Sequence, residues 1–306
     1  MKKALLLSAV AAMFLFSCKK DHTASTTPSG KKYKVTFNVT NFTQGQSAFS
    51  VRHNTRNLAS SDTLTNLNSY FDVLYYVVYN QPYPANPKIV IQDSTMSNMG
   101  MLTDSLAPGT YDVILIAGKK GLTIFPPFLY KAGDATFGYG GKWQDAFFYQ
   151  TNLTVGSGNV SENLTLHRIV GKLELQILDN IPANADSISM TINPEQTDKI
   201  LQYGISDAGS ASSVVTFSQA IPPSAKGNPN FIMDRIIGNL NNSFTVVLTC
   251  KDAANNIIAT KTVLNVSCMA NEKTILSGKL FNSTNTQTFT AHLDTTWTNN
   301  PNQYSW

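Results

Sequence analysis

The sequence predicts an all-β protein, and three observations support this fold class. Short stretches in which apolar and polar residues alternate recur along the chain, which is the pattern of half-buried strands. Clusters of Asn, Ser, Gly and Pro separate these stretches, and charged residues make up only 14% of the chain. Helical periodicity is weak throughout. A sandwich of two packed sheets is therefore the favoured architecture.

The chain starts with a basic segment, an apolar segment and a cysteine. Two lysines precede an apolar run over residues 4–16, which Ser17 and Cys18 follow. The run is too short to span a bilayer core of about 30 Å as a helix, so residues 1–17 are predicted to be a cleaved signal peptide. The four residues that end at Cys18 resemble the bacterial lipobox. This resemblance implies a thioether-linked diacylglycerol on Cys18 and a fatty acyl group, such as palmitate, on its new amine. The alternative is a plain signal peptide with an incidental cysteine.

A polar segment separates the proposed lipid from the fold. Residues 18–32 are rich in Thr and Ser and contain Pro28 and Gly30. Such a composition cannot build an apolar core, so we expect a flexible spacer. Residues 33–306 are enough for two medium domains or one large one, and no segment among them predicts a membrane-spanning helix.

The charge balance argues against a polyanionic partner. The chain has 23 Lys and Arg residues against 19 Asp and Glu residues, which is a formal net charge of +4. So small an excess gives no basis for binding nucleic acid.

Two strands are predicted early in the chain. Val35, Phe37 and Val39 alternate with polar residues over 33–42, so this strand should bury one face. Residues 71–79 are apolar on both parities and predict a central strand that is covered on both sides or lies at an interface.

Two further elements follow before the middle of the chain. Pro108 and Gly109 predict a turn, and the strand after it should cover residues 111–117. The best helix signal, for one or two turns, lies around residues 142–149.

A change of parity marks a boundary near residue 166. Leu164 and Leu166 are apolar at even positions, whereas the apolar set from Ile169 onward lies at odd positions. Because a slip of one residue turns a strand over, the chain must bulge, bend or change sheets here. We therefore expect two domains, 33–166 and 167–306.

Two cysteines remain in the mature chain. Residues 244–250 and 257–266 predict the arms of one hairpin, which would place Cys250 opposite a residue near Ile258 and away from Cys268. Buried, unpaired thiols are therefore favoured over a disulfide, although a pair of cysteines in a secreted chain leaves the disulfide open.

Catalytic motifs are absent from the sequence. The four histidines are far apart, and His167, beside Arg168, is better explained as a structural residue than as a base. The sequence contains no Gly-x-Ser-x-Gly elbow, no phosphate-binding glycine loop and no metal-ligand spacing. Carboxylates are scattered, so no glycosidase pair can be nominated. We expect no enzyme activity, no cofactor and no metal.

Aromatic residues favour a second class of function. Trp143, Phe147, Phe148 and Tyr149 lie close together, and three more aromatic residues, Trp297, Tyr304 and Trp306, lie near the C-terminus. Rings exposed in a row would stack on sugars. The alternative for the first group is that Trp143 and Phe147 cover the core from a short helix. The C-terminal group should pack on something, either this protein or another.

Four stretches carry a family resemblance. They are the lipobox with its sequel Lys19-Lys20-Asp21, LYYVVYN over 74–80, APGTYDVILIAG over 107–118, and LTLHRIVGKLELQI over 164–177 with its sequel DNIPANADSISMTI over 179–192. In this order they resemble the FimB/Mfa-type fimbrillin-like lipoproteins of Bacteroidota. The resemblance implies two consecutive transthyretin-like β-sandwich domains. It also implies an outer-membrane, lipid-anchored subunit that anchors or terminates a strand-exchange pilus (type V) and supports adhesion, with a fimbrillin-like subunit as its partner.

The resemblance also assigns roles to particular residues. Pilins of this kind assemble by β-augmentation, in which a strand of one subunit fills a sheet position in another. The strand-exchange segment would carry Val35, Phe37 and Val39. Arg52 and Arg56 would be processing positions for a trypsin-like protease, although ordinary loop charge is the favoured explanation for an anchor subunit.

The C-terminal end supplies a candidate subunit contact. Residues 286–293 predict a terminal strand, and the tail that follows carries the aromatic side chains of Trp297, Tyr304 and Trp306.

Two functions therefore compete. A pilus anchor would have a detachable strand or an open groove and a stable protein neighbour. A surface glycan-binding lipoprotein of a nutrient-uptake system would instead have coplanar, exposed aromatic rings.

Overall fold

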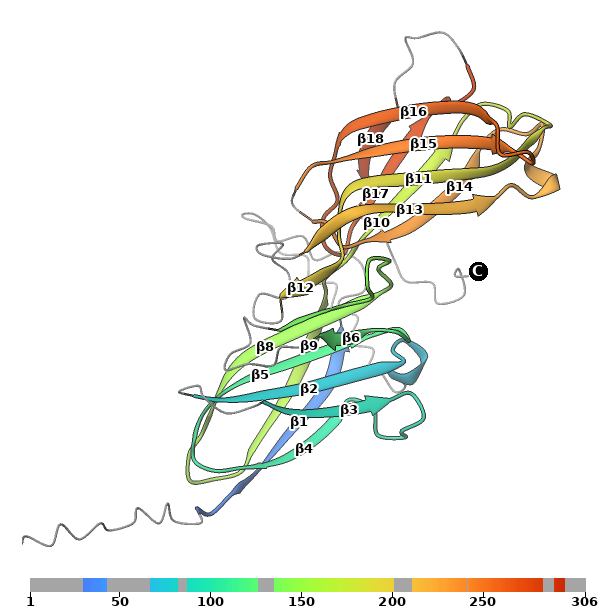
Figure 1. Ribbon diagram of the computed structural model, residues 1–306. Coiled ribbons are helices and arrows are strands. Elements are labelled where there is room, and N and C mark those ends of the chain that lie inside the picture. The colour runs from blue at the N-terminus through green and yellow to red at the C-terminus, as the bar shows by residue number, and fades with distance from the viewer. Residues whose placement is uncertain are drawn as a thin grey trace, which may run out of the picture. The chain divides into compact units, whose positions relative to one another are not determined.

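The computed structural model describes residues 30–42, 67–81, 87–125, 135–200, 211–240, 242–282 and 289–294. Nearly every element in these ranges is a strand, which confirms the predicted all-β class (Figure 1). The helical elements in the described ranges are two short 3-10 turns, η1 (Leu67–Ser69) and η3 (Pro223–Ala225). No helix in the described part of the chain is long and apolar enough to cross a membrane. All strands belong to one unit, Lys32–Trp306.

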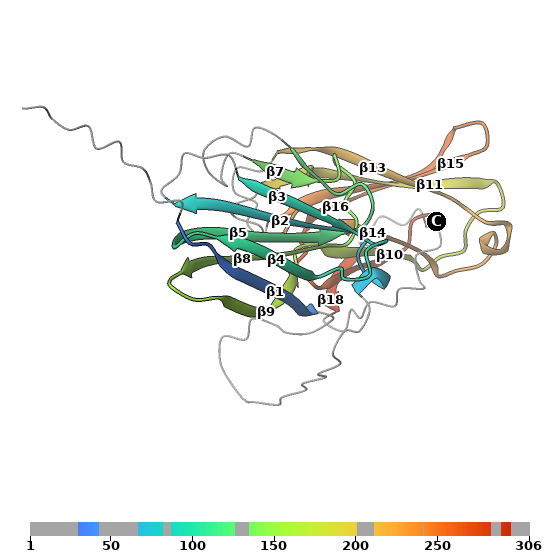
Figure 2. The ribbon, with the colours of Figure 1, turned by 90° about the horizontal axis from the view of Figure 1, so that it is seen from below.

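The first seven long strands form one folded sheet with the order β3-β2-β5-β8-β9-β1-β4. The strands are β1 (Tyr33–Phe42), β2 (Val73–Gln81), β3 (Lys88–Asp93), β4 (Met101–Leu106), β5 (Gly109–Gly118), β8 (Ala146–Val155) and β9 (Val160–Arg168). The pairing of β8 with β9 is confined to Phe147↔Arg168 and Phe148↔His167. The sheet therefore splits into two layers, β3-β2-β5-β8 and β9-β1-β4, and one apolar cluster draws its side chains from both (Figure 2).

The two early strand predictions are confirmed. In β1, Val35, Phe37 and Val39 are buried and the residues between them are not, so the alternation predicted the correct face. Strand β2 is central, between β3 and β5, and it contributes to a different apolar cluster on each face. It starts at Val73, two residues after the predicted start at Phe71.

The predicted helical turns around residues 142–149 are wrong. Gly140 and Gly141 have positive φ angles and form a turn, and β8 then starts at Ala146. Strand β8 pairs with β5 along its whole length, from Ala146 to Val155. Ten residues of sheet pairing outweigh the single i, i+4 aromatic spacing that favoured a helix.

A second apolar cluster covers the outer face of β2 and β5. It contains side chains from β6 (Thr123–Phe125) and β7 (Thr136–Gly138), which form a small sheet with β12 (Asp198–Ile200) in the order β12-β7-β6. Because β12 lies beyond residue 166, this sheet joins segments from the two halves of the chain.

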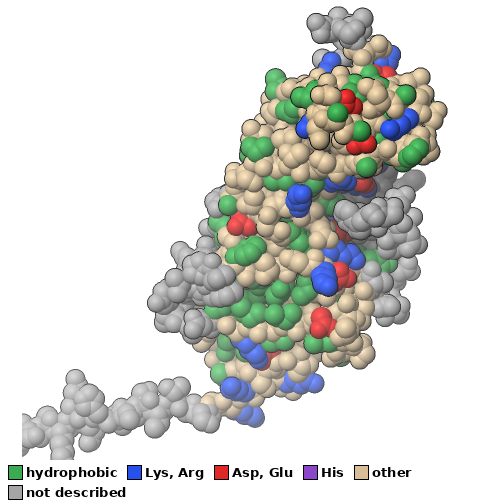
Figure 3. Space-filling view, turned by 45° about the vertical axis from the view of Figure 1, so that its right-hand side comes forward, with side chains coloured by type: hydrophobic (Ala, Val, Ile, Leu, Met, Phe, Trp, Pro, Cys, Tyr) green, Lys and Arg blue, Asp and Glu red, His purple; other side chains and the backbone are tan. Residues whose placement is uncertain are grey.

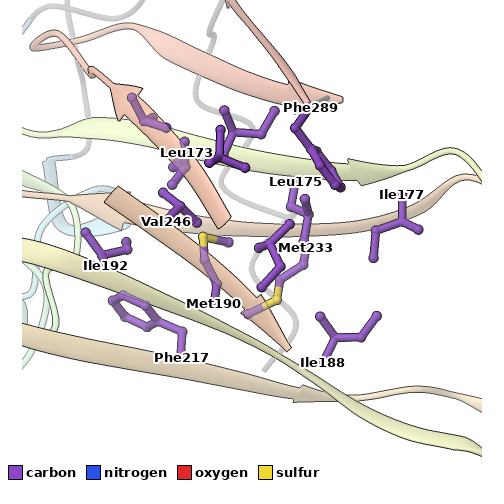
Figure 4. Close-up of a cluster of buried hydrophobic side chains, with 14 of the residues drawn as sticks. Leu173, Leu175, Ile177, Ile188, Met190, Ile192, Phe217, Met233, Val246 and Phe289 are labelled. Atoms are coloured by element: carbon purple, nitrogen blue, oxygen red, sulfur yellow. The ribbon is translucent and has the colours of Figure 1, made fainter. Parts of the chain in front are cut away.

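The second half forms two four-stranded sheets with the orders β14-β10-β17-β18 and β13-β11-β15-β16. The strands are β10 (Gly171–Ile177), β11 (Ala185–Gln196), β13 (Ser212–Ala220), β14 (Phe231–Ile237), β15 (Phe244–Asp252), β16 (Ile257–Val266), β17 (Lys273–Gly278) and β18 (Thr290–Asp294). Alternate side chains of both sheets meet between them, for example Leu173 and Leu175 of one and Met190 and Ile192 of the other (Figure 4). This is the packing of a β-sandwich.

The parity change near residue 166 corresponds to a change of sheet. Strand β9 ends at Arg168 in the first sheet, and β10 starts at Gly171 in another. Between them Ile169 and Val170 are both fully buried. The division into domains 33–166 and 167–306 stays a prediction.

Both cysteines of the second half are free and buried, so a disulfide between Cys250 and Cys268 is not formed. The hairpin β15–β16 places Cys250 opposite Ala259, one residue from the predicted position. Burial in apolar surroundings raises the pKa of the Cys250 thiol to about 11 and that of Cys268 to about 12.

These thiols should be inert in the folded protein. At about pH 8, where an ordinary thiol is partly ionised, a maleimide should leave both peptides unmodified until the chain is unfolded. The pKa of each thiol is higher in the folded than in the unfolded chain, so the protonated thiols contribute to stability below about pH 8.5. This contribution is lost as the pH rises toward 12. Mass spectrometry of the labelled peptides is the measurement. Labelling of either cysteine before unfolding, or a mass two hydrogens lower, would contradict the arrangement.

Candidate functional site: the slot of the first strand

Strand β1 lies in a slot between two strands. It pairs with β4 in antiparallel fashion from Tyr33↔Leu106 to Asn38↔Met101, and with β9 in parallel fashion from Val35↔Val160 to Phe42↔Leu166 (Figure 2). The residues directly before β1 are those of the predicted spacer. One strand thus fills an interior sheet position and continues into the N-terminal segment.

The inner face of β1 fills a row of apolar positions. Val35 and Phe37 are 0% exposed, and Val39 and Phe42 are almost as deeply buried. The Phe37 ring lies 5.7 Å from that of Tyr76, and the Phe42 ring contacts Tyr70, Phe71 and Phe147 edge-on at 4.7 to 5.2 Å. Aromatic pairs in this geometry add to the apolar burial. The three residues predicted for strand exchange therefore lie together on one buried face.

The outer face of β1 makes fewer and longer contacts. Asn38 Nδ2 donates to Asn163 Oδ1 at 3.4 Å, and Thr40 Oγ1 donates to the Leu164 carbonyl at 3.5 Å. Side-chain selectivity for this strand must therefore come from the inner face. The backbone ladders on both sides supply the rest of the binding, as in β-augmentation.

Strand β4, which forms one side of the slot, is also held by side chains of β2 and β3. Gln92 of β3 donates through Nε2 to the Met101 carbonyl at 3.0 Å and accepts from the Gly100 amide at 2.8 Å. The buried Asp104 carboxylate forms an ion pair with Lys88 and accepts from the Tyr76 hydroxyl at 3.3 Å. Burial, with the nearby carboxylate second, raises the pKa of Tyr76 well above its usual range, so the phenol stays a donor. These bonds hold β4 against β3.

Arg168 fixes the far end of the slot, and the sequence did not predict this role. Its Nε and Nη2 donate to the two Asp145 carboxylate oxygens at 2.8 and 3.2 Å, and Nη1 donates to Asn271 Oδ1 at 2.9 Å. The guanidinium also lies 5.0 Å from the centre of the Phe147 ring. Arg168 is 2% exposed, whereas the neighbouring His167 is exposed. The sequence predicted a structural role for His167, but it is the neighbouring Arg168 that is buried and bonded within the fold.

A second buried polar cluster lies beside the β12–β7 pairing. Glu195 Oε1 accepts from the Gly238 amide at 2.6 Å, and Lys199 Nζ donates to the Gly238 carbonyl at 2.9 Å. Trp143 Nε1 donates to the Gln196 carbonyl at 2.7 Å, and the Lys199 ammonium lies 5.7 Å from the Trp143 ring. Both charges are fully buried and engage backbone groups. The cluster joins the loop before β8 to the second half.

The charged groups of both clusters are bonded to other groups of the fold. Within the described ranges no three His, Cys, Asp or Glu side chains are grouped as metal ligands. On the face shown in Figure 3, acidic and basic side chains are interspersed over most of the surface, and several basic side chains gather at its lower end.

The aromatic group at residues 143–149 forms no exposed platform. Trp143, Phe147 and Phe148 are at most 6% exposed, and successive side chains of β8 enter different clusters. The core interpretation is therefore correct, although a strand and a turn, not a helix, present the side chains.

The other predicted site residues lie outside the described ranges. These are Cys18, Arg52, Arg56, Trp297, Tyr304 and Trp306. The predicted terminal strand over 286–293 is found as β18, Thr290–Asp294, paired with β17.

The fold and the slot define a class of protein: an all-β sandwich chain whose first strand fills an interior sheet position. Residues 129–305 match the model of a family described as a family of unknown function, DUF6562. This range exceeds half of the chain, so the chain belongs to that family. A comparison with curated proteins finds no match.

Three solved structures from Bacteroidota are similar to this chain. A candidate cell adhesion protein from Bacteroides eggerthii aligns with a TM-score of 0.52 at 8% identity, covering 88% of this chain and 97% of that one. A candidate polysaccharide-binding protein from Bacteroides thetaiotaomicron aligns with 0.51 at 11% identity, covering 81% and 92%. The fimbrial anchor protein Mfa2 from Porphyromonas gingivalis aligns with 0.48 at 9% identity, covering 86% and 97%. The first two show that this chain shares its fold with these two proteins, in agreement with the all-β class that the sequence predicted.

Gly238 should tolerate no side chain. A Cβ at this position would lie 2.0 Å from Trp143 Nε1, and Trp143 is held by its bond to Gln196. Gly238→Ala should therefore lower the free energy of unfolding by about 1–3 kcal/mol in chemical denaturation. Gly156→Ala is the matched control, because a Cβ there meets nothing within 4 Å, and its effect should stay within about 0.5 kcal/mol. Equal effects of the two substitutions would show that the cluster is not packed as described.

Proposed function

We propose that this chain is an outer-membrane, lipid-anchored fimbrial subunit that anchors or terminates a strand-exchange pilus and supports adhesion. The observation that carries the proposal is the slot: the strand next to the predicted spacer fills an interior sheet position with a regular row of apolar side chains. The shared fold with a candidate cell adhesion protein supports the adhesion role. The proposed lipid is a diacylglycerol on Cys18.

In this proposal the chain works through backbone pairing and not through catalysis. Filling the slot needs a strand with apolar side chains at alternate positions, and β1 supplies it from within the chain. A subunit whose β1 stays in place has a slot that is closed to other subunits, and only detachment of β1 would open the groove that the sequence led us to expect of an anchor. Such a subunit would end a row of strand exchanges, which is what an anchor or a terminator does.

In this role Arg52 and Arg56 would stay uncut. Cleavage after either would separate the lipid and β1 from the rest of the chain covalently. The aromatic residues Trp297, Tyr304 and Trp306 are the proposed contact with the next subunit, which would be a fimbrillin-like protein.

The competing function is a surface glycan-binding lipoprotein of a nutrient-uptake system. One observation favours it, the shared fold with a candidate polysaccharide-binding protein. Against it, the rings of Trp143, Phe147 and Phe148 are buried and cannot stack on sugars.

The decisive experiment is purification of the acylated protein from native membranes in mild detergent, with mass spectrometry of the bound proteins. A stoichiometric fimbrillin-like neighbour should survive high salt, because apolar burial and backbone pairing are little affected by screening, and denaturation should release it. A monomer, or a complex with an outer-membrane transporter, would overturn the pilus assignment and favour glycan binding.

A substitution at Cys18 tests the anchor separately. Cys18→Ala should abolish the lipid mass on the mature N-terminus and move the protein from the detergent phase to the aqueous phase in detergent partitioning. Cys250→Ala is the control and should leave both properties unchanged, because that thiol is buried in the fold. An unchanged partition of the Cys18 variant would mean that the lipid is not what holds the protein to the membrane.

A further inference from the structure

The N-terminal end of β1 and the C-terminal end of β9 lie at opposite ends of the ladder that joins these two strands. The two strands are parallel, with Val35 opposite Val160 and Phe42 opposite Leu166. The N-terminal segment leaves β1 at the Tyr33 end. The chain leaves β9 at the other end, through Arg168, toward the second half.

This arrangement decides how a pull along the chain acts on the hydrogen bonds. A force between the N-terminal segment and the second half draws β1 toward its N-terminus and β9 toward its C-terminus. The two strands must then slide past each other, so the bonds of the ladder are strained together and not one after another. Sliding also drags Val35, Phe37 and Phe42 across the apolar core.

Hydrogen bonds hold the C-terminal end of β9, which is the end that would receive the force from the second half. Arg168 is bonded to Asp145 and to Asn271, which lies in the turn between β16 and β17. The Ile169 amide donates to the Ala146 carbonyl at 3.0 Å, and the Asn271 amide donates to the Val170 carbonyl at 2.9 Å. These bonds tie β9, β8 and the second half together at one point. β9 therefore cannot easily follow β1 when β1 is pulled.

We propose that β1 is a mechanical clamp, which lets the fold resist tension between its membrane tether and a partner bound to the second half. The physiological part of this proposal rests on the lipid anchor at Cys18, whereas the clamp itself rests only on strand direction and burial. Resistance is a kinetic property, since forced unfolding depends on the barrier to sliding and not on equilibrium stability.

Single-molecule pulling tests the clamp on the full chain, produced without export so that Cys18 carries a free thiol. One handle is attached at Cys18 and the other at Asn184→Cys, an exposed position in the second half. The buried Cys250 and Cys268 should not react with the handles. The first rupture should release the chain up to the start of η1, an added length on the order of 100 Å.

The peeling geometry is the first control. With handles at Cys18 and Gly158→Cys, both attachment points lie at the same end of the β1–β9 ladder, and Gly158 is exposed. The bonds then break one after another, and the first rupture force should fall by roughly a factor of two or more. Equal forces in the two geometries would overturn the clamp.

Two matched valine substitutions separate the clamp from general stability. Val35 in β1 and Val113 in β5 are both 0% exposed and belong to the same apolar cluster. Val35→Ala should lower the first rupture force between Cys18 and position 184, whereas Val113→Ala should leave that force unchanged. Equal weakening by both would refute the proposal. If the pulling experiments show no clamp but Cys18 is lipidated, the anchor function still stands. If the clamp is found but Cys18 carries no lipid, only the anchor function is refuted.

Discussion

The burial of β1 between β4 and β9 is the interaction on which the first half of the fold depends. In the strand order of its sheet, β4 is terminal and pairs with β1 alone. The ladder from β9 to β4 therefore runs through this single strand. The same strand brings Phe37 and Phe42 into the cluster between the two layers. Removing β1 would leave two unpaired strand edges and an open apolar core, which is a strong thermodynamic reason to fill the slot.

The buried ionic groups have a different role from the apolar row. Arg168 pairs with Asp145, and Glu195 and Lys199 engage the backbone around Gly238. Replacing such pairs by apolar groups is often neutral for stability, whereas breaking them is costly. We infer that their main effect is to specify how the segments on either side of residues 169–171 pack. That specificity explains why charged residues so far apart in sequence converge in the interior of a chain with few charges.

The proposed function rests on the apolar burial of β1 and on the direction of this strand, and it requires no catalytic group. A strand that fills its own slot removes the site that a neighbour would occupy, and the direction of that strand suits a molecule held at one end. Neither property needs a nucleophile, a metal or a charged groove. The function of such a chain would depend on what binds outside the described strands, where the proposed lipid and the proposed aromatic contact would lie.

The sequence alone determined the strands whose side chains alternate, because a half-buried strand exposes its period of two directly in the residue order. The faces of β1 and the hairpin β15–β16 follow from this, and so does an irregularity after Leu166, which the structure shows to be a change of sheet between Arg168 and Gly171. Only the tertiary structure decided that residues 146–149 are a strand and that Arg168 is bonded to Asn271. Each depends on partners distant in the chain: β5 for the strand, and the turn before β17 for the arginine. The local sequence pattern indicates which face of a strand is apolar. The partners of a strand or side chain that lie far away in the sequence are determined by packing, and no short motif encodes them.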